Sequence, residues 1–366
     1  MGRSGRRGEP ASLRVFVAEP ELHSSLAPQD SLRLDLFQAV AVTELLLQKW
    51  CEPPPPARLH LSTLIQQILS LIAQYGGLTA KEAWEITCRS GPFRNVDVPM
   101  FGKLLRGLAA NGILMQAADG TLLHAPLGET IVNHYSFYTA FWTLEEFKLV
   151  HGTSVLGTLP ISYPVPVRSL ILFGGRRWRV VDVDDHAKEI VVCPAQSGRA
   201  PAFGGAGGAV HRRIHDEMHR LYRSSETPAY LDRKAADLFR EGREQFLHLG
   251  LDRTSVIGNE ADSIVFLWAG DQVSNTLLVH LQSLGFTGLS FGVGLLIEDI
   301  EPAVLRRRLA EIFITAPPDP ESVADSVPNT AIDRYDSFLP ADLRSQNYAS
   351  AKLDTVQTWE VLRRLA

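Results

Sequence analysis

The stretch "VPMFGKLLRGLAANGILMQAADGTLLHA" (residues 98–125) decides the fold of the middle of the chain. Pro99 stands where a first helical turn would begin, apolar residues recur at helical spacing, and Asn111-Gly112 ends the pattern. Two short apolar runs then flank Asp119-Gly120, a dipeptide that favours a tight hairpin turn. The stretch therefore predicts a helix followed by a β-hairpin.

Two further helices are predicted just before this stretch. The segment "LSTLIQQILSLIAQYGG" (61–77) is amphipathic and ends on glycines. The segment "LTAKEAWEITCRSG" (78–91) carries Thr79 and, three residues later, Glu82, the pattern of a capping box. Three helices followed by a hairpin is the order of a winged-helix domain, and a generic small helical domain is the alternative.

A proline run marks a boundary on the N-terminal side. Four consecutive prolines in "CEPPPPAR" (51–58) predict an extended, semi-rigid connector. Before it, "LRVFVAE" (13–19) alternates and is rich in β-formers, which predicts a strand. The segment "SLRLDLFQAVAVTELLLQKW" (31–50) has apolar residues at helical spacing and predicts a helix.

The C-terminal side changes character after about residue 126. Residues 168–195 predict strands broken by Gly174-Gly175 and by a "DVDDHAKE" turn, as in a small β-barrel. A glycine-laden loop, a long helical stretch, a strand–helix–strand pattern and a terminal helix follow. We therefore expect a multidomain α+β protein with four domains, at 1–55, 56–140, 141–215 and 216–366.

Composition restricts the function classes. The chain has 366 residues, 45% of them apolar, and a formal net charge of −5, so any nucleic-acid surface must be a local patch. Cys51, Cys88 and Cys193 form no CxxC pair, which argues against a disulfide framework and a zinc knuckle. The sequence shows no signal peptide, and no apolar run approaches the length of ~20 residues that a membrane span needs. We expect a cytoplasmic protein without a membrane partner.

The opening "MGRSGRRGEP" (1–10) combines glycines with arginines, whose planar guanidinium groups bind phosphate as a bidentate fork. Followed by 13–19, it resembles the last conserved motif of superfamily 2 helicases, in which Gly2-Arg3 and Gly5-Arg6 are the matching residues. The resemblance implies that Arg3 and Arg6 are catalytic arginines that reach the phosphates of a bound nucleotide. A disordered basic tail is the alternative.

The order of the remaining segments resembles the C-terminal half of the large helicase-related (Lhr-type) proteins, which are DEAD/DEAH-box ATP-dependent helicases. The strings that carry the resemblance are "RSGPFRNVDVPMFGKLLRGL" (89–108), "LFGGRRWRVVDVDDHAKEIVVCPA" (172–195) and "GRAPAFGGAGG" (198–208). It implies that 1–55 is the remnant of a second RecA-like motor lobe, followed by a winged helix, a β-barrel and an α/β helical C-terminal domain.

The motifs of the ATP-binding lobe are missing from this sequence. It contains no GxxxxGK[ST] phosphate loop and no DExH acidic box. We therefore expect that the chain binds no cofactor and hydrolyses no ATP alone, and that ATP and Mg²⁺ bind only in the complete helicase. A separately encoded N-terminal motor half is the implied protein partner.

Nucleic-acid contacts are expected where cations accompany flat side chains. On the third helix these are Lys103 and Arg106, for which a solvated helix face is the alternative. In the barrel, Arg176, Arg177 and Arg179 flank Trp178, which alternates with Val180 and could instead point inward. In the loop, the resemblance places Phe203 at an aromatic position suited to base stacking. The expected ligand is single-stranded or partly duplex DNA, with RNA an open alternative.

The segment "HRRIHDEMHR" (211–220) repeats a histidine every fourth residue, at His211, His215 and His219. A helix would place the three along one side, where they could bind a metal. Because no aspartate or cysteine cluster joins them, we favour a basic helix that contacts phosphates through Arg212 and Arg213, with no metal. The competing functions are a stand-alone winged-helix DNA-binding protein and, less favoured, a metal-dependent hydrolase.

Overall fold

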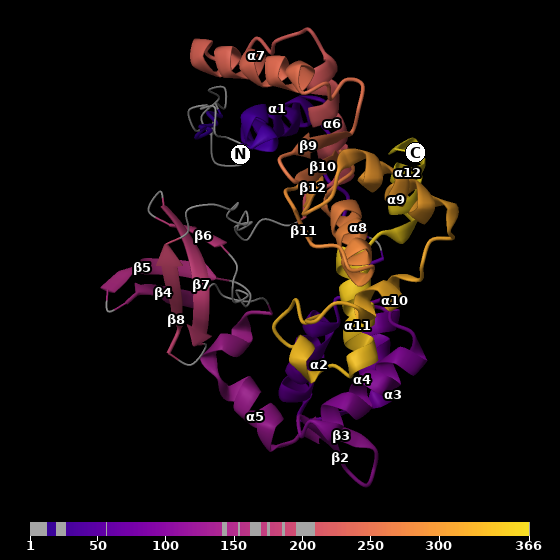
Figure 1. Ribbon diagram of the computed structural model, residues 1–366. Helices are drawn as coiled ribbons and strands as arrows, with labels where there is room; N and C mark the ends of the chain where they lie inside the picture. Colours follow the sequence, from indigo (N-terminus) through magenta and orange to yellow (C-terminus); the bar gives the residue numbers. More distant parts are fainter. Residues whose placement is uncertain are drawn as a thin grey trace, which may run out of the picture. The chain divides into compact units, whose positions relative to one another are not determined.

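The computed structural model describes residues 13–19, 27–55, 57–140, 145–152, 154–161, 170–173, 176–184, 187–194 and 209–365. The described residues form a mixed α+β protein with twelve α-helices and three small sheets (Figure 1). By their contacts they fall into two units. The first unit takes the described residues of Met1–Pro54, Ala209–Ala316 and Val356–Ala366, and the second those of Pro55–Gly208 and Pro317–Thr355. The four domain ranges drawn from the sequence stay a prediction.

The first unit combines helices from both ends of the chain with one antiparallel sheet of strand order β11-β12-β10-β9. Its elements are a 3₁₀ turn η1 (Pro28–Leu32), α1 (Leu34–Leu47), α6 (Arg212–Arg223), α7 (Arg233–His248), β9 (Val256–Asn259), β10 (Asp262–Phe266), α8 (Asp271–Ser283), β11 (Gly288–Ser290), β12 (Gly294–Ile297), α9 (Pro302–Ile314) and α12 (Thr355–Leu365). The strand–helix–strand pattern and the terminal helix predicted from the sequence are confirmed.

Strand β10 explains the layering of the first unit. Ile264 and Phe266 join the hydrophobic cluster that contains α1, α6 and α7, whereas Val265 joins the cluster that contains α8, α9 and α12. Successive side chains of a strand point to opposite faces. Helices therefore cover both faces of this sheet, which is why β10 reads as a continuous apolar run rather than an alternating one.

The predicted strand at 13–19 is wrong. These residues pair with no strand among the described residues, and Leu13, Val15 and Phe16 are exposed. Glu19 instead caps the start of α1, where its carboxylate accepts a hydrogen bond from the Leu36 N–H at 2.9 Å. A β-forming pattern becomes a strand only where a second strand supplies hydrogen-bond partners, and this segment has a helix terminus beside it instead.

The second unit contains two sheets. Its elements are α2 (Leu61–Tyr75), β1 (Leu78–Thr79), α3 (Ala80–Trp84), a π-helical turn η2 (Glu85–Arg89), α4 (Val98–Ala110), β2 (Leu114–Gln116), β3 (Thr121–His124), α5 (Pro126–Asn133), a 3₁₀ turn η3 (Tyr135–Tyr138), β4 (Glu145–His151), β5 (Ser154–Ile161), β6 (Leu170–Phe173), β7 (Arg176–Asp184), β8 (Glu189–Pro194), α10 (Pro320–Asp325), a 3₁₀ turn η4 (Asp336–Phe338) and α11 (Ala341–Lys352).

Residues 61–124 fold in the element order predicted from the sequence. Strand β3 pairs with both β1 and β2, so the three-stranded sheet has the order β1-β3-β2. The predicted capping box is confirmed, because the Thr79 side chain accepts from the Glu82 N–H and the Glu82 side chain accepts from the Thr79 N–H. Gly76 ends α2 at φ +74°, a left-handed conformation that suits glycine.

The C-terminal segment around η4 shares the core of residues 61–124. Tyr335, Leu339 and Leu343 are buried in the same hydrophobic cluster as α2 and α4. The carboxylate of Asp336, fully buried, accepts hydrogen bonds from the N–H groups of Ile332 and Asp333. This capped turn fixes the segment where it meets the helices.

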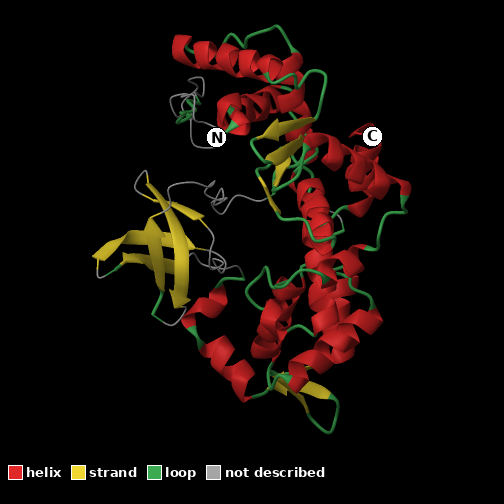
Figure 2. Ribbon diagram, viewed as in Figure 1, coloured by secondary structure: helices red, strands yellow, loops and turns green. Residues whose placement is uncertain are grey.

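The predicted small β-barrel is wrong. The strands of the sheet found there are drawn in yellow in Figure 2. Their order is β5-β4-β8-β7-β6, with β4 and β8 parallel and the other neighbours antiparallel. Strands β5 and β6 are the two edges, and no ladder joins them within the described residues. The sheet is therefore open, because a barrel requires its edge strands to pair. The "DVDDHAKE" hairpin turn is confirmed, since Asp184 pairs with Glu189 across β7 and β8.

Candidate nucleic-acid interface

Helix α4 is the element that the sequence singled out for nucleic-acid contact. The Asp97 side chain caps it by accepting a hydrogen bond from the Met100 N–H at 2.8 Å, and Pro99 occupies its first turn. Leu104 and Leu108 are buried in the core as helical spacing predicts, and Phe101 is buried beside them. The polar residues therefore lie on the outward side.

Part of that outward side is covered by the segment around η4. A Cβ added to Gly107 would lie 2.6 Å from the Pro340 side chain, so only a glycine allows this approach. The Asn111 side chain donates a hydrogen bond to the Phe338 carbonyl at 3.2 Å. The C-terminal end of α4 is therefore a packed surface rather than a free one.

The two predicted cations of α4 differ in their partners. The ammonium of Lys103 pairs with the carboxylate of Asp342 on α11, and both side chains are about half exposed. Arg106 is exposed and has no hydrogen bond or ion pair to any residue that the structure describes. Arg106 is therefore the cation of α4 that is available to a phosphate, and Lys103 is partly neutralised.

The hairpin β2–β3 adds no positive charge. Residues 113–125 contain neither lysine nor arginine, and the turn carries Asp119. The Thr121 N–H donates to the Asp119 carboxylate at 3.0 Å, and this hydrogen bond lowers the pKa of Asp119. A phosphate contact by this hairpin would rest on backbone N–H groups and on uncharged side chains such as Gln116.

The side chain of Trp178 lies inside the five-stranded sheet. Its side chain is 7% exposed and packs with Leu149, Val180 and Ile190 in the core of the five-stranded sheet. Along β7, inward Trp178 and Val180 alternate with outward Arg179, as the period of a strand requires. The inward alternative raised by the sequence is the one observed.

The three arginines of β7 remain predicted phosphate contacts, and the strand pairing gives their backbone positions. Arg176 pairs with Phe173 and Arg177 with Leu172, across the ladder of β6 and β7. Arg179 lies further along the strand and is exposed. Strand β7 and helix α4 belong to separate hydrophobic clusters of the second unit.

Helix α6 carries the next two predicted contacts. Arg212 pairs with Asp216 one turn later at 3.5 Å and donates to the Gln357 side chain at 3.3 Å. Arg213 is exposed, and its N–H donates to the ring of His211. Arg212 is thus engaged inside the first unit, whereas the guanidinium of Arg213 faces solvent.

The three histidines of α6 have separate structural roles. His211 caps the helix, and His219 stacks on Trp268 with ring centroids 5.2 Å apart. His215 is 1% exposed and accepts a hydrogen bond from the Gly270 N–H at 2.9 Å. Burial lowers the pKa of both His215 and His219. Among the described residues no group of three His, Cys, Asp or Glu side chains is arranged to hold a metal.

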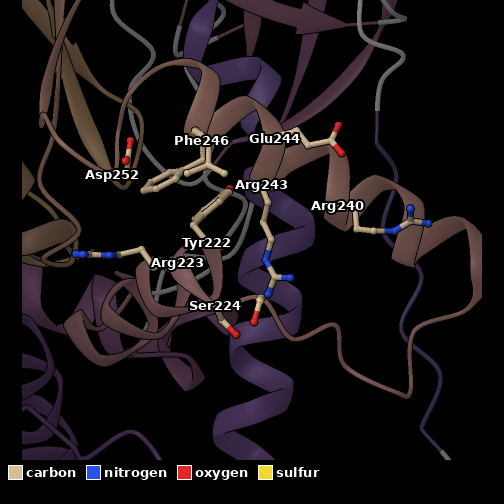
Figure 3. Close-up of a pocket in the computed structure, with 10 residues that line it drawn as sticks. Tyr222, Arg223, Ser224, Arg240, Arg243, Glu244, Phe246 and Asp252 are labelled. Atoms are coloured by element: carbon tan, nitrogen blue, oxygen red, sulfur yellow. The ribbon is translucent and has the colours of Figure 1, made fainter.

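A cavity of about 420 Å³ lies between the end of α6 and helix α7 (Figure 3). The Arg243 side chain in its wall donates to the Leu221 carbonyl at 2.9 Å and lies over the Phe239 ring. Arg223 and Arg240 also line it but extend away from one another. The arginines do not converge on one point, so the cavity is no phosphate cradle.

Three predicted site residues, Arg3, Arg6 and Phe203, lie outside the described residues. No family model, curated protein or solved structure matches the chain. No helix among the described residues is both long enough and apolar enough to cross a membrane.

The sequence did not predict the residues that contact α4 from segments far away in the chain. Asp342 lies 239 positions after Lys103, and Pro340 is also far from Gly107 in sequence. Gly107 was the available signal, because glycine inside a helix often marks a close approach. The sequence did not indicate which segment approaches.

Proposed function

We propose that this chain is the nucleic-acid-engaging C-terminal part of an ATP-dependent helicase of the Lhr type, acting in the cytoplasm on DNA or RNA. The observation that carries the proposal is the topology of residues 61–124. A helix, a short strand, two helices and a hairpin whose last strand lies between the other two support a winged-helix assignment. Winged helices commonly bind duplex or branched nucleic acid through the third helix, here α4.

Arg106 makes the central contact in this proposal. Its guanidinium is exposed on α4, carries no competing carboxylate among the described residues, and can bind a phosphate with two hydrogen bonds. Lys103 contributes less because Asp342 partly neutralises it. Arg213 and the β7 arginines are further phosphate contacts.

The binding experiment uses the full chain and a labelled duplex with a single-stranded tail. Fluorescence anisotropy should show saturable binding that weakens several-fold in Arg106→Ala. Arg89→Ala is the matched control, since Arg89 is an exposed arginine of the same unit whose partner, Glu85, lies one turn away. Equal affinity of all three proteins would remove Arg106 from the interface.

The helicase assignment rests on the N-terminal resemblance. Arg3 and Arg6 would reach the nucleotide phosphates, while residues outside this sequence would supply the phosphate loop and the Mg²⁺ ligands. Mixing the chain with its motor half should produce strand-stimulated ATP hydrolysis, and Arg6→Ala should abolish it. Arg253→Ala is the control, because Arg253 is 79% exposed in the first unit. Unchanged turnover in Arg6→Ala would refute this role.

A second candidate is a stand-alone winged-helix nucleic-acid-binding protein. Two observations favour it: residues 13–19 join no sheet among the described residues, and the ring of Phe37 on α1 stacks on that of Tyr222 on α6 with centroids 3.6 Å apart. The N-terminal segment is thus integrated into the first unit. If the motor half leaves ATP turnover unchanged while tailed duplex still binds, this candidate replaces the helicase.

A further inference from the structure

The 3₁₀ turn η3 presents two tyrosine rings to solvent. Tyr135 is 81% exposed and Tyr138 is 90% exposed, which makes this tyrosine pair the most exposed large apolar side chains described in the second unit. Phe137 between them is 8% exposed and lies in the core with α2 and α4. Exposed aromatic rings are enriched at binding surfaces, because their apolar area contributes favourable free energy only when a ligand covers it.

The turn that carries the tyrosine pair is held rigidly. Arg334, nearly 200 positions away, donates to the carbonyls of Ser136 and Thr139 and to both of their hydroxyls. The Gln66 side chain donates to the Phe137 carbonyl at 3.3 Å. A surface ordered before binding loses little entropy when a ligand arrives. The rings are therefore a preorganised platform rather than a loose loop.

The spacing of the tyrosine pair suits stacking of flat rings. Residues three apart in a 3₁₀ turn project from the same side, and the rise of about 2.0 Å per residue separates them by about 6 Å. Stacked bases repeat about every 3.4 Å, so one base between two rings needs about 7 Å. A small opening of the tyrosine side chains would admit one base between them or one upon each.

The charge around the platform also favours a nucleic-acid strand. Arg334 lies over the neighbouring Tyr335 ring at 5.1 Å, and the adjacent Asp333 is paired with Arg58 at 3.1 Å. The guanidinium of Arg334 also contacts the turn that carries the tyrosine pair, so a phosphate beside a stacked base would meet a cation there.

We propose that Tyr135 and Tyr138 form a stacking platform for the bases of single-stranded DNA or RNA. The platform deepens the proposed function and rests on it: single strand would bind here while α4 contacts duplex phosphates. None of the nucleic-acid contacts predicted from the sequence included these residues.

The test uses the full chain and an oligothymidylate carrying one 2-aminopurine, whose fluorescence is quenched by stacking. Tyr135→Ala and Tyr138→Ala should each weaken binding about 5- to 100-fold and reduce the quenching. Tyr138→Phe should bind like the wild type because it keeps the ring. Tyr75→Ala is the matched control, since Tyr75 is 61% exposed on α2 of the same unit. Equal denaturation midpoints will show that the variants fold.

The outcomes separate this inference from the proposed function. Normal binding of oligothymidylate by both alanine variants overturns the platform, whatever Arg106→Ala does. The same variants would also be tested with a decaproline peptide. If both alanine variants lose binding of this peptide but still bind the oligonucleotide, the tyrosine pair is a peptide site and the platform is overturned. Tyrosine-dependent binding of single strand without any binding of tailed duplex would support the platform and remove the winged-helix proposal. Failure to bind either nucleic acid would overturn both.

Discussion

Helices α4 and α6 both carry several basic residues, yet their paired cations meet different carboxylates: a half-exposed one on α11 for α4, and a buried one for α6. On α4, Lys103 is paired and Arg106 is free of partners among the described residues. On α6, Arg212 is engaged with Asp216, and Arg220 donates two hydrogen bonds to the Glu217 carboxylate. Two of the four arginines of α6 are thus committed to their own unit, while Arg213 faces solvent. The number of cations in a segment overstates its capacity to bind phosphate unless their carboxylate partners are known.

The two helices also bury different things. Helix α4 buries an aliphatic stripe and leaves its charges outside, whereas α6 buries Glu217 and His215, each at 1% exposure. A buried charge requires a partner, because burial without one costs several kcal/mol. Arg220 of α6 is therefore needed for stability, whereas Arg106 of α4 is available for binding.

The largest effect is expected in the buried stripe of α4. Leu104→Ala should lower the free energy of unfolding by about 2–5 kcal/mol, because Leu104 is completely buried and its removal leaves a cavity. Urea denaturation followed by circular dichroism measures the change. Leu127→Ala, at an exposed leucine of the same unit, should cost less than about 1 kcal/mol. Equal losses in the two variants would contradict the assignment of the stripe.

The next effect concerns the segment that covers α4. Burial raises the pKa of Asp336 to about 6 from the ordinary 3.8. Since its pKa in the folded state is higher than in the unfolded state, its contribution to stability is fully present below pH 3.8 and is lost as pH rises through about 6. The wild type should therefore lose about 2–3 kcal/mol relative to Asp336→Asn between pH 4 and pH 7. Denaturation of both proteins at the two pH values checks this, and parallel pH profiles would contradict it.

A smaller effect separates α6 from α4. Arg220→Gln should lower the free energy of unfolding by about 1 kcal/mol, because Glu217 loses its partner while the half-exposed arginine limits the loss. Arg213→Gln, at an exposed residue of the same helix, should leave the denaturation midpoint unchanged. If the two variants unfold together, Arg220 is not committed to the fold.

The smallest effect is a gain of affinity on α4. Asp342→Asn should release Lys103 and tighten binding of tailed duplex about two- to five-fold, with a steeper dependence on salt. Asp325→Asn removes the same charge from an exposed position on α10 and should have little effect. A gain of equal size in both variants would mean that net charge, not the Lys103–Asp342 pair, controls binding.

Local patterns predicted the elements of the chain well. The capping box of Thr79 and Glu82, the Asp119-Gly120 turn and the amphipathic helix at 61–75 all depend on residues that are close in sequence. The same locality explains why the mixed α+β class was confirmed. Such signals determine which segments become helices and hairpins, but not what those segments contact.

The features of the candidate site that the sequence did not show depend on contacts between distant segments. Trp178 lies among arginines in the sequence, yet the strand period turns it into the core while Arg179 faces out. Lys103 was expected to face outward, and the sequence did not show that Asp342 pairs with it in space. The strand at 13–19 failed for lack of a pairing strand. Only tertiary packing decides such questions.

The salt dependence of binding tests the difference between the two helices most directly. Affinity for a labelled tailed duplex would be measured from about 50 to 200 mM salt for the wild type, Arg106→Ala and Arg220→Ala. The slope of log affinity against log salt should fall by about one in Arg106→Ala and stay unchanged in Arg220→Ala. An unchanged slope in Arg106→Ala, or an equal reduction in Arg220→Ala, would contradict the claim that only uncommitted cations contact phosphate.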